Sequence, residues 1–251
     1  MRIVTWNTRK AINDLSSKLN WIDRHHNPDI LLIQESGNPK MYFPKSSEWK
    51  TALWNPKIQH KQKDEGNAIL SQSIRGALIN VGSLQGWLEI ASFDLPCGST
   101  AIANIHAPTD TKDHAAFGVS PKTCGSWLMN FAMPQIMEIT SGFDNWIIGG
   151  DTNCSRTISD RLNRKIYRQA HEAMVSQFGF VEAMFIGRPA NSIEAHDEIS
   201  TWRRSKNVDW TVPNDHFFVK GNIEKHVVGC KVATHPDPPS DHAPVILELS
   251  F

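Results

Sequence analysis

The sequence lacks three features that would each have indicated a class of protein. Its four cysteines include no C-x-x-C pair, so their spacing favours neither zinc nor a disulfide framework, and we expect reduced thiols. Its 26 basic and 26 acidic side chains leave no net charge to attract polyanions at long range. No apolar run approaches the roughly 20 residues needed to span a bilayer, so no membrane partner is expected. A polyanionic partner would need a local basic patch or a metal ion.

The composition is that of an ordered globular protein. Hydrophobic residues make up 40% of the 251 positions, and nine of the residues are Trp. A chain of this length buries a sizeable core, and no low-complexity linker divides it, so we predict a single domain over residues 1–251. The first strand-like run begins at Arg2 and leaves no room for a signal peptide, which predicts a cytoplasmic protein. The oligomeric state stays open.

Strand-like and helix-like segments alternate along both halves of the chain. Apolar residues at helical spacing over 15–22 separate two strands, one at the start of the chain and one over 29–34. This strand–helix–strand order implies parallel pairing in one sheet. Each half ends on a histidine followed by Ala-Pro, at His106 and His242. We predict an α/β fold in which two sheets pack face to face, with helices outside and the site at one edge.

Four apolar strands end in polar residues that suit metal binding or proton transfer. Asn7 and Glu35 each follow an early strand, and Gly149-Gly150-Asp151-Thr152-Asn153 follows the run Trp146-Ile147-Ile148. Ser240-Asp241-His242 directly precedes the last strand. α/β proteins usually build their sites where buried strands meet loops. Packing alone does not explain four such clusters.

Asp151 is the best candidate to orient and deprotonate an attacking water. Two glycines precede it and let the backbone turn sharply and approach a substrate, and the amide of Asn153 can hold Asp151 or a phosphate. The alternative interpretation is a turn that caps the next helix, which explains Asp151 but does not need Asn153.

Two histidines can move protons near neutral pH. His242 can donate to a phosphate oxygen, and His106 can act as the general acid on a leaving alkoxide, a role often worth ~10²–10⁴-fold in rate. The alternatives are an incidental histidine near the end of the chain for His242 and a strand-end histidine satisfied by backbone groups for His106.

A set of motifs in a fixed order resembles the endonuclease/exonuclease/phosphatase superfamily, which includes exonuclease III, apurinic endonucleases, deoxyribonuclease I, phosphoinositide 5-phosphatases and neutral sphingomyelinases. The resemblance implies a four-layer α/β sandwich and Mg²⁺-dependent cleavage of a phosphate ester. Its motifs run from the first strand to the last: Thr5-Trp6-Asn7, Leu32-Ile33-Gln34-Glu35, Gly66-Asn67-Ala68-Ile69-Leu70-Ser71, Asn104-Ile105-His106, Gly150-Asp151-Thr152-Asn153, Thr201-Trp202, Asp215-His216-Phe217-Phe218-Val219 and Ser240-Asp241-His242.

The resemblance also implies roles for individual residues. Glu35 becomes the main ligand of Mg²⁺, and the side-chain carbonyl of Asn7 becomes a second ligand beside Glu35. Hard oxygen ligands of this kind suit Mg²⁺, which Mn²⁺ can replace. Asp241 can supply a further carboxylate. Asp215, rather than the adjacent Asp241, becomes the acid that orients His242. Where apurinic endonucleases tend to carry an acid, this chain has Arg9, which leaves a second metal ligand there in doubt.

Substrate-binding candidates lie around these positions. Arg156 is the basic residue nearest the Asp151 turn, and Trp202 offers a ring for base stacking or a core side chain with equal weight. Asn104 belongs to the His106 motif and is placed among the substrate-binding residues. If residues 159–176 form a helix, four more cations share one face and could contact phosphates, but for the distal members a solvated helix face is the favoured interpretation: Arg161, Arg164, Lys165 and Arg168.

Three functions stay open from the sequence. The first is a Mg²⁺-dependent nuclease that hydrolyses DNA or RNA phosphodiester bonds, with nucleic acid as its substrate. The second is a phosphatase or phospholipid phosphodiesterase on the same scaffold; His106 bears on this choice, because exonuclease III relatives tend to carry Tyr there and the other branches His. The third is a non-catalytic binding module, which is disfavoured because no expected catalytic position is lost.

Overall fold

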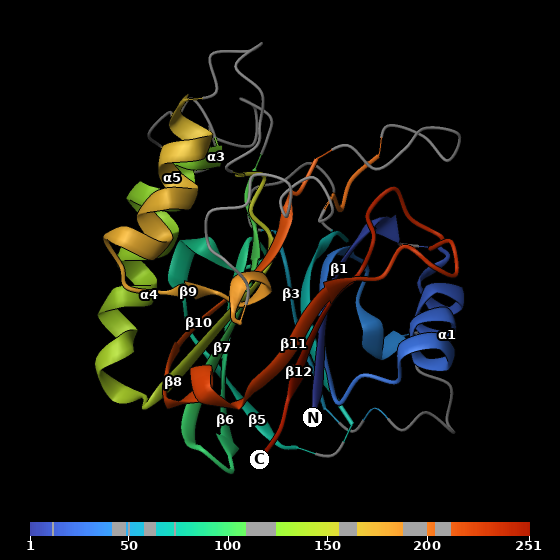
Figure 1. The fold of residues 1–251 in the computed structure, drawn as a ribbon. Coiled ribbons are helices and arrows are strands. Elements are labelled where there is room, and N and C mark those ends of the chain that lie inside the picture. Colours follow the sequence, from blue (N-terminus) through green and yellow to red (C-terminus); the bar gives the residue numbers. More distant parts are fainter. Residues whose placement is uncertain are drawn as a thin grey trace.

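Two six-stranded mixed β-sheets pack face to face, with helices on both outer faces, in the computed structural model (Figure 1). The structure describes residues 1–11, 13–41, 49, 51–57, 64–72, 74–108, 124–155, 165–187, 200–203 and 212–251. The arrangement confirms the sandwich expected from the sequence. The two halves of the chain do not form one sheet each, because the last two strands of the chain, β11 and β12, join the sheet built by the N-terminal strands.

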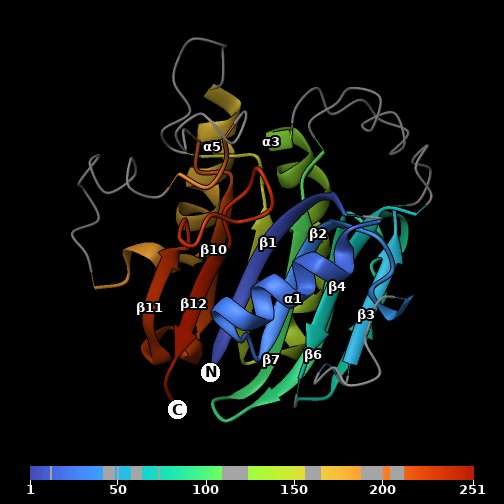
Figure 2. The same ribbon diagram turned by 90° about the vertical axis from the view of Figure 1, so that its right-hand side faces the viewer.

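The first sheet has the order β11-β12-β1-β2-β4-β3. The predicted strand–helix–strand unit supplies its one parallel pair, β1 with β2. The connecting helix α1 (Leu15–His26) lies across the outer face of this sheet, as Figure 2 shows, and buries the side chains of Leu15, Leu19 and Ile22. The strands span Arg2–Ala11 (β1), Ile30–Ser36 (β2), Thr51–Pro56 (β3), Gly66–Ser71 (β4), Val227–Val232 (β11) and Val245–Leu249 (β12).

The second sheet has the order β5-β6-β7-β8-β10-β9. Its register brings site residues together, because parallel β7 and β8 pair His106 with Asp151, and antiparallel β8 and β10 pair Asp151 with Asp215. The strands span Gly76–Ile79 (β5), Leu88–Leu95 (β6), Gly98–His106 (β7), Asn145–Asp151 (β8), Val181–Glu182 (β9) and Asp215–Gly221 (β10).

Helices α4 (Met133–Ile139) and α5 (Lys165–Ser176) cover the outer face of the second sheet (Figure 1). A π-helical turn, Leu128–Ala132, joins α4 to the short helix α3 (Cys124–Trp127), and Pro134 follows this turn directly as the second residue of α4. Short 3₁₀ turns occupy Pro39–Met41, Gly82–Leu84, Thr140–Gly142, Ala183–Phe185 and Asn222–His226. Among the described helices, none is both long and apolar enough to cross a membrane.

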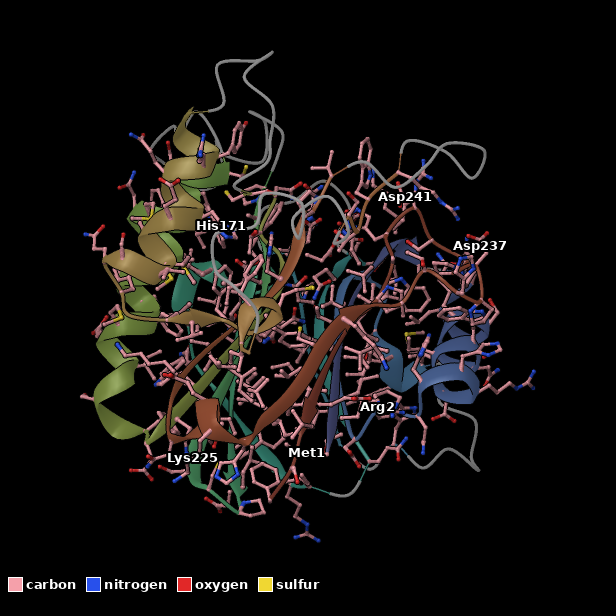
Figure 3. All side chains as sticks on the ribbon, in the orientation of Figure 1. Met1, Arg2, His171, Lys225, Asp237 and Asp241 are labelled. Carbon is pink, nitrogen blue, oxygen red and sulfur yellow. The ribbon has the colours of Figure 1, made fainter. Side chains whose placement is uncertain are left out.

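The core has three apolar layers between four layers of secondary structure. The central layer lies between the sheets and includes Ile3, Leu32, Ile147 and Phe217, all 0–1% exposed. The outer layers lie under α1 and under α3–α5. Figure 3 shows side chains filling the space between the ribbons, with His171 on the α5 side and Asp241 on the side of α1. The sheets are thereby held rigidly enough to fix the strand ends that carry the polar motifs.

Candidate active site

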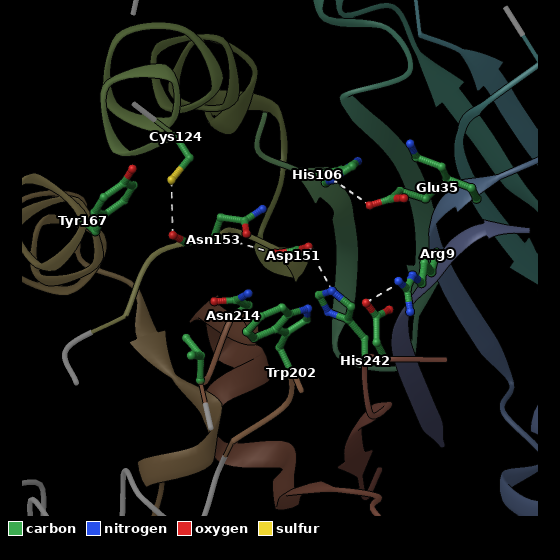
Figure 4. A pocket seen from close by; sticks show the side chains of 13 residues that line it. Arg9, Glu35, His106, Cys124, Asp151, Asn153, Tyr167, Trp202, Asn214 and His242 are labelled. Atoms are coloured by element: carbon green, nitrogen blue, oxygen red, sulfur yellow. Dashed lines mark hydrogen bonds and ion pairs between the residues drawn. The ribbon is translucent and has the colours of Figure 1, made fainter. Parts of the chain in front are cut away.

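A cleft of about 710 Å³ opens at the edge of the sandwich where the motif-bearing strands end (Figure 4). Both sheets contribute to its wall, since Glu35 ends β2 while His106 and Asp151 end β7 and β8. Two further predicted residues, Asn7 and Asp215, lie just below the wall and are 1% exposed. The predicted residues that line the cleft are Glu35, His106, Asp151, Asn153, Trp202, Asp241 and His242.

Backbone strain is concentrated at this cleft. Five non-glycine residues of the described chain have a positive φ. Four of them line the cleft and have φ between 50° and 53°: Arg9, Lys10, Glu35 and Asn153. The fifth, Asn27, caps α1. A side chain in this region costs roughly 1–2 kcal/mol, and such residues cluster at functional sites. Gly150 has φ 141°, and a Cβ there would collide with the carbonyl of Ile105. The turn before Asp151 therefore requires glycine.

Asn7 joins two carboxylates of the cleft. Its Nδ2 donates to Glu35 Oε1 at 3.0 Å and to Asp151 Oδ2 at 2.9 Å, and its Oδ1 accepts from the backbone N–H of Arg9 at 2.9 Å. The amide nitrogen, not the oxygen predicted to bind a metal, thus faces the carboxylates. For Asn7 to bind a cation through its oxygen, its side-chain amide has to rotate by half a turn. The orientation of this amide is assigned from its hydrogen-bond network.

Asp151 is nearly buried, with 2% of its surface exposed, and is surrounded by acids. Burial, followed by the charges of Asp215 and Glu35, raises the pKa of Asp151 to about 7 against the opposing effects of His242 and Asn7. The backbone N–H of Asn153 donates to Asp151 Oδ1 at 3.1 Å, while the Asn153 amide donates to the carbonyl of Ala107 at 2.9 Å. Asn153 therefore holds the turn as well as the carboxylate.

His242 and Asp215 form the acid–imidazole pair expected from the sequence. His242 Nδ1 lies 2.8 Å from Asp215 Oδ2, and His242 Nε2 lies 3.8 Å from Asp151 Oδ2. Burial lowers the pKa of His242, but the Asp215 and Asp151 carboxylates outweigh it and raise that pKa to about 10. The imidazole is therefore held as a cation that points its Nε2–H into the cleft.

His106 and Asp241 line the cleft on either side of Glu35 and Arg9. His106 Nε2 lies 3.5 Å from Glu35 Oε1, and its ring packs against Trp87 with the centroids 5.5 Å apart. Asp241 Oδ2 lies 3.3 Å from Nε of Arg9, so a cation at this carboxylate would compete with the guanidinium. At the position where apurinic endonucleases tend to carry an acid, this chain thus has a cation, Arg9, paired with Asp241.

Asn104 lies between the two sheets rather than in the cleft. It is 0% exposed, and its amide donates to the carbonyls of Ile33 and Ala68, each at 2.9 Å, while its oxygen accepts from Gln34 Nε2 at 2.6 Å. These bonds join β7 to strands of the opposite sheet. They give Asn104 a role in holding the sandwich together instead of the substrate contact predicted for it.

The basic candidates are only partly described. Arg156, Arg161 and Arg164 lie outside the described residues. Arg168 on α5 pairs with Glu172 at 3.1 Å on the exposed side of the helix, which fits the solvated-surface alternative for this position. Two cations that sequence reasoning did not select for substrate contact, Arg9 and Lys10, line the cleft itself. The bulge between Asn7 and Ala11 directs this pair to the rim.

A buried group beside the site was missed from the sequence. Glu182 lies between two imidazoles, with Oε2 3.0 Å from His171 Nε2 and Oε1 2.9 Å from His216 Nδ1; we call these three residues the buried clamp. His216 Nε2 lies 2.9 Å from the carbonyl of Cys154 and 3.0 Å from that of Pro213. The clamp therefore ties together the loops that follow Asn153 and precede Asp215.

The charges of the buried clamp are balanced. Burial raises the pKa of Glu182, but its bonds to the two imidazoles outweigh this and leave it far below the ordinary value. Burial lowers the pKa of His216, and the bond to Glu182 outweighs that and raises it. No motif signals this group, because its members come from α5, β9 and β10 and only His216 belongs to a recognised motif, Asp215-His216-Phe217-Phe218-Val219.

Comparisons with known proteins agree with this geometry. A sequence profile described as the Endonuclease/Exonuclease/phosphatase family matches residues 4–242. No curated protein sequence matches the chain.

Three similar solved structures each cover all of this chain. They are the 3′ phosphatase NExo from Neisseria bound to a product DNA hairpin (17% identity, all of that chain covered, TM-score 0.66), an AP endonuclease from Archaeoglobus fulgidus (17%, all covered, 0.68) and the AP endonuclease LMAP from Leishmania major (16%, 87% covered, 0.72). At these identities the structures establish the shared fold.

The family profile covers nearly the whole chain, and the two-sheet sandwich is the fold of these enzymes. The acid, amide and imidazole groups at the cleft are those that phosphate-ester hydrolysis requires. The chain belongs to the endonuclease/exonuclease/phosphatase family and is a hydrolase of phosphoester bonds.

Proposed function

We propose that this chain is a Mg²⁺-dependent nuclease that hydrolyses DNA phosphodiester bonds. The observation that carries the proposal is the meeting, in one cleft, of a hydrogen-bonded Asn7–Glu35–Asp151 group with an Asp215–His242 pair. These residues come from both sheets and from opposite ends of the sequence. Packing requires no such convergence of charge, and burial together with the charges of Asp215 and Glu35 raises the pKa of Asp151 to about 7.

The donor set fits Mg²⁺. Glu35 and Asp241 offer carboxylates at the cleft wall, and Asn7 offers an amide oxygen once its amide flips. A divalent cation here would offset the crowded acids that raise the pKa of Asp151. Mg²⁺ binds one or two carboxylates and keeps several waters, and Mn²⁺ accepts the same oxygen ligands. When bound, the ion supplies charge stabilisation to the phosphoryl oxygens and the leaving group.

The protein's own residues supply the proton transfers. Asp151, oriented by the backbone N–H of Asn153, accepts a proton from the attacking water. His242, held as an imidazolium by Asp215, donates a hydrogen bond to a nonbridging phosphate oxygen. His106, at the opposite wall beside Glu35, donates a proton to the leaving oxygen.

Three features support DNA as the substrate. The similar solved structures are those of DNA-processing enzymes by their descriptions: a 3′ phosphatase with a DNA hairpin product and AP endonucleases. Arg9 and Lys10 place two cations at the rim of the cleft, where phosphates flanking the cleaved one would lie. The Trp202 ring lines the same cleft and can stack on a base.

A second candidate is phosphomonoester hydrolysis at a DNA 3′ end. One of the similar structures is described as a 3′ phosphatase, and His106 can assist the leaving alkoxide of a monoester as it does that of a diester. The two candidates share the cleft and differ in whether the substrate carries a phosphate monoester or a diester.

The test uses a panel of substrates with Mg²⁺, Mn²⁺ or chelator. The 5′-labelled members are a duplex with an abasic site, single strands, a 3′-phosphate duplex and RNA, and the unlabelled members are supercoiled plasmid and a phospholipid vesicle. We expect chelator-sensitive cleavage of DNA diesters that weakens steeply as salt rises. Asp151→Asn should abolish it, and Asp94→Asn, an exposed acid at the end of β6 that lies away from the cleft, should not. Release of phosphate from the 3′-phosphate duplex alone would support the second candidate, and cleavage of the lipid alone would contradict both.

A further inference from the structure

Two cysteine sulfurs lie close together directly behind the catalytic turn. Cys124 Sγ and Cys154 Sγ are 4.0 Å apart, although 29 residues separate their positions in the sequence. Cys124 begins α3 and lines the cleft (Figure 4), whereas Cys154 follows Asn153 and is 0% exposed. No other pair among the four cysteines has a described sulfur–sulfur contact. The sequence spacing gave no reason to pair these two residues.

The distance is compatible with a bond after a small movement. A disulfide needs its sulfurs about 2.05 Å apart, so the two atoms have to approach by roughly 2 Å in total. Cys124 lies at the end of a short helix and Cys154 in a loop, and neither is within a strand. Side-chain rotation with a small shift of α3 is therefore sufficient.

The chemistry assigns different roles to the two thiols. Cys124 lines the cleft with 2% of its surface exposed, so a hydroperoxide small enough to enter the cleft meets its sulfur before that of Cys154, which is 0% exposed. Burial also raises the pKa of the Cys154 thiol and keeps it protonated. The Cys124 sulfur attacks the O–O bond of the hydroperoxide, and its S–H proton passes to the leaving oxygen, which gives a sulfenic acid and one molecule of alcohol or water. The Cys154 sulfur then attacks the sulfenic sulfur, and its S–H proton leaves with the sulfenic hydroxyl as water as the S–S bond forms. In total two thiols lose two hydrogens and the O–O bond is reduced.

The pair is coupled to the catalytic turn. In the reduced protein the Cys124 thiol lies 3.2 Å from the carbonyl of Asn153, to which it donates, and the N–H of Asn153 in turn holds Asp151. Forming the disulfide removes the only hydrogen of the Cys124 sulfur and draws residue 154 toward α3. Asn153, already at a positive φ, must shift with it.

We propose that Cys124 and Cys154 are a reversible thiol-oxidation site, in which a hydroperoxide closes a disulfide that displaces Asn153 and lowers the activity of the cleft. The effect on activity rests on the proposed function, whereas the disulfide itself does not. Displacing a catalytic group by about 1 Å can cost ~10²-fold in rate, so the oxidised enzyme should be roughly 10–100-fold slower.

The test treats the native 251-residue protein with one to ten molar equivalents of hydrogen peroxide and then blocks the unreacted thiols. The intact mass and a peptide map of the product are then measured. We expect a mass loss of two hydrogen atoms, one linked peptide pair joining Cys124 to Cys154, and reversal by dithiothreitol. Cys154→Ser should give no linkage and should keep its own untreated rate after peroxide. Cys97→Ser and Cys230→Ser are the matched controls and should form the linkage and slow like the wild type.

Each result decides one part of the proposal. Thiols that stay unreacted, a link between other cysteines, or over-oxidation of Cys124 without a link would overturn it. A mapped Cys124–Cys154 disulfide with an unchanged cleavage rate would overturn the coupling to the catalytic turn. If no phosphate ester is cleaved even before oxidation, the proposed function fails while the mapped disulfide still stands.

Discussion

Two clusters of buried acids and imidazoles lie within this fold, and they differ in charge balance and in access to solvent. The catalytic cleft gathers Glu35, Asp151 and Asp215 around His242, and it opens to the surface. The buried clamp places one carboxylate, Glu182, between His171 and His216, and all three are at most 3% exposed. Among the described residues, the group Asp151, Asp215 and His242 and the buried clamp each bring one oxygen or nitrogen atom per residue within 4.8 Å of the others.

The difference shows in the direction of the pKa shifts. Burial, followed by the neighbouring carboxylates, raises the pKa of Asp151, whereas two imidazoles lower that of Glu182. His216 has an acceptor at each ring nitrogen, which holds it as an imidazolium and removes it as a metal ligand. The same residue types thus make a site that needs a cation when acids predominate and an internal salt bridge when the charges balance.

Asp151→Asn should have the largest effect on the cleavage rate without lowering the stability of the fold. Loss of the proton acceptor should lower kcat by ~10²–10⁴-fold. The free energy of unfolding should stay unchanged or rise, because the substitution removes one of the crowded charges. Steady-state cleavage and urea unfolding of the same preparation check both parts, and a variant that keeps more than a tenth of the wild-type rate would contradict the role of Asp151.

Glu182→Gln should show the reverse pattern. Removing one partner of a buried ion pair typically costs about 3–5 kcal/mol, so the unfolding free energy should fall by that amount. The Mg²⁺ concentration that gives half-maximal activity should not change, because no predicted ligand touches Glu182. Glu172→Gln is the matched control, since its partner Arg168 is exposed and the pair should contribute less than about 1 kcal/mol. Equal destabilisation by the two variants would contradict the clamp.

His106→Gln should lower kcat by about 10²-fold on DNA. A general acid matters less when the leaving group is already acidic, so a nitrophenyl phosphodiester should lose much less activity than DNA. The ratio of the two losses is the measurement. Equal losses on both substrates would assign His106 to binding or packing, for instance against Trp87, instead of proton donation.

The smallest effect concerns pH. Glu182 has a lowered pKa when folded, so its contribution to stability is present above the unfolded value of about 4.3 and is lost as pH falls through the folded value. His216 has a raised pKa, so its contribution is complete below about 6.5 and is lost as pH rises through the folded value. The unfolding free-energy difference between wild type and Glu182→Gln should therefore be largest between these values. A difference independent of pH would contradict the charge assignment.

Most strands and most residues of the cleft could be predicted from the sequence, because the motif residues lie at or next to the ends of buried strands. The register of β7, β8 and β10 then fixes His106, Asp151 and Asp215 at one edge. Asn104 shows the limit of this reasoning. It lies two residues before His106 and therefore on the same face of β7, but one step further from the edge, where that face is covered by the other sheet.

The clamp and the edge strands depend on contacts that no local pattern encodes. His171 and Glu182 carry no motif, and their partners come from separate elements. Strand β3 lies in a polar, proline-broken stretch of the sequence, and it forms because β4 supplies its partner. The thiol pair Cys124 and Cys154 likewise becomes visible only when α3 packs behind the catalytic turn.

The central claim is that one divalent cation binds at Glu35 and serves the chemistry of Asp151. Its most direct test is the Mg²⁺ dependence of DNA cleavage by wild type and by Glu35→Gln. We predict that Glu35→Gln raises the Mg²⁺ concentration for half-maximal activity by roughly tenfold or more, a loss of about 1.4 kcal/mol in binding. Cleavage by the wild type that persists in chelator, or identical Mg²⁺ curves for the two proteins, would contradict the account.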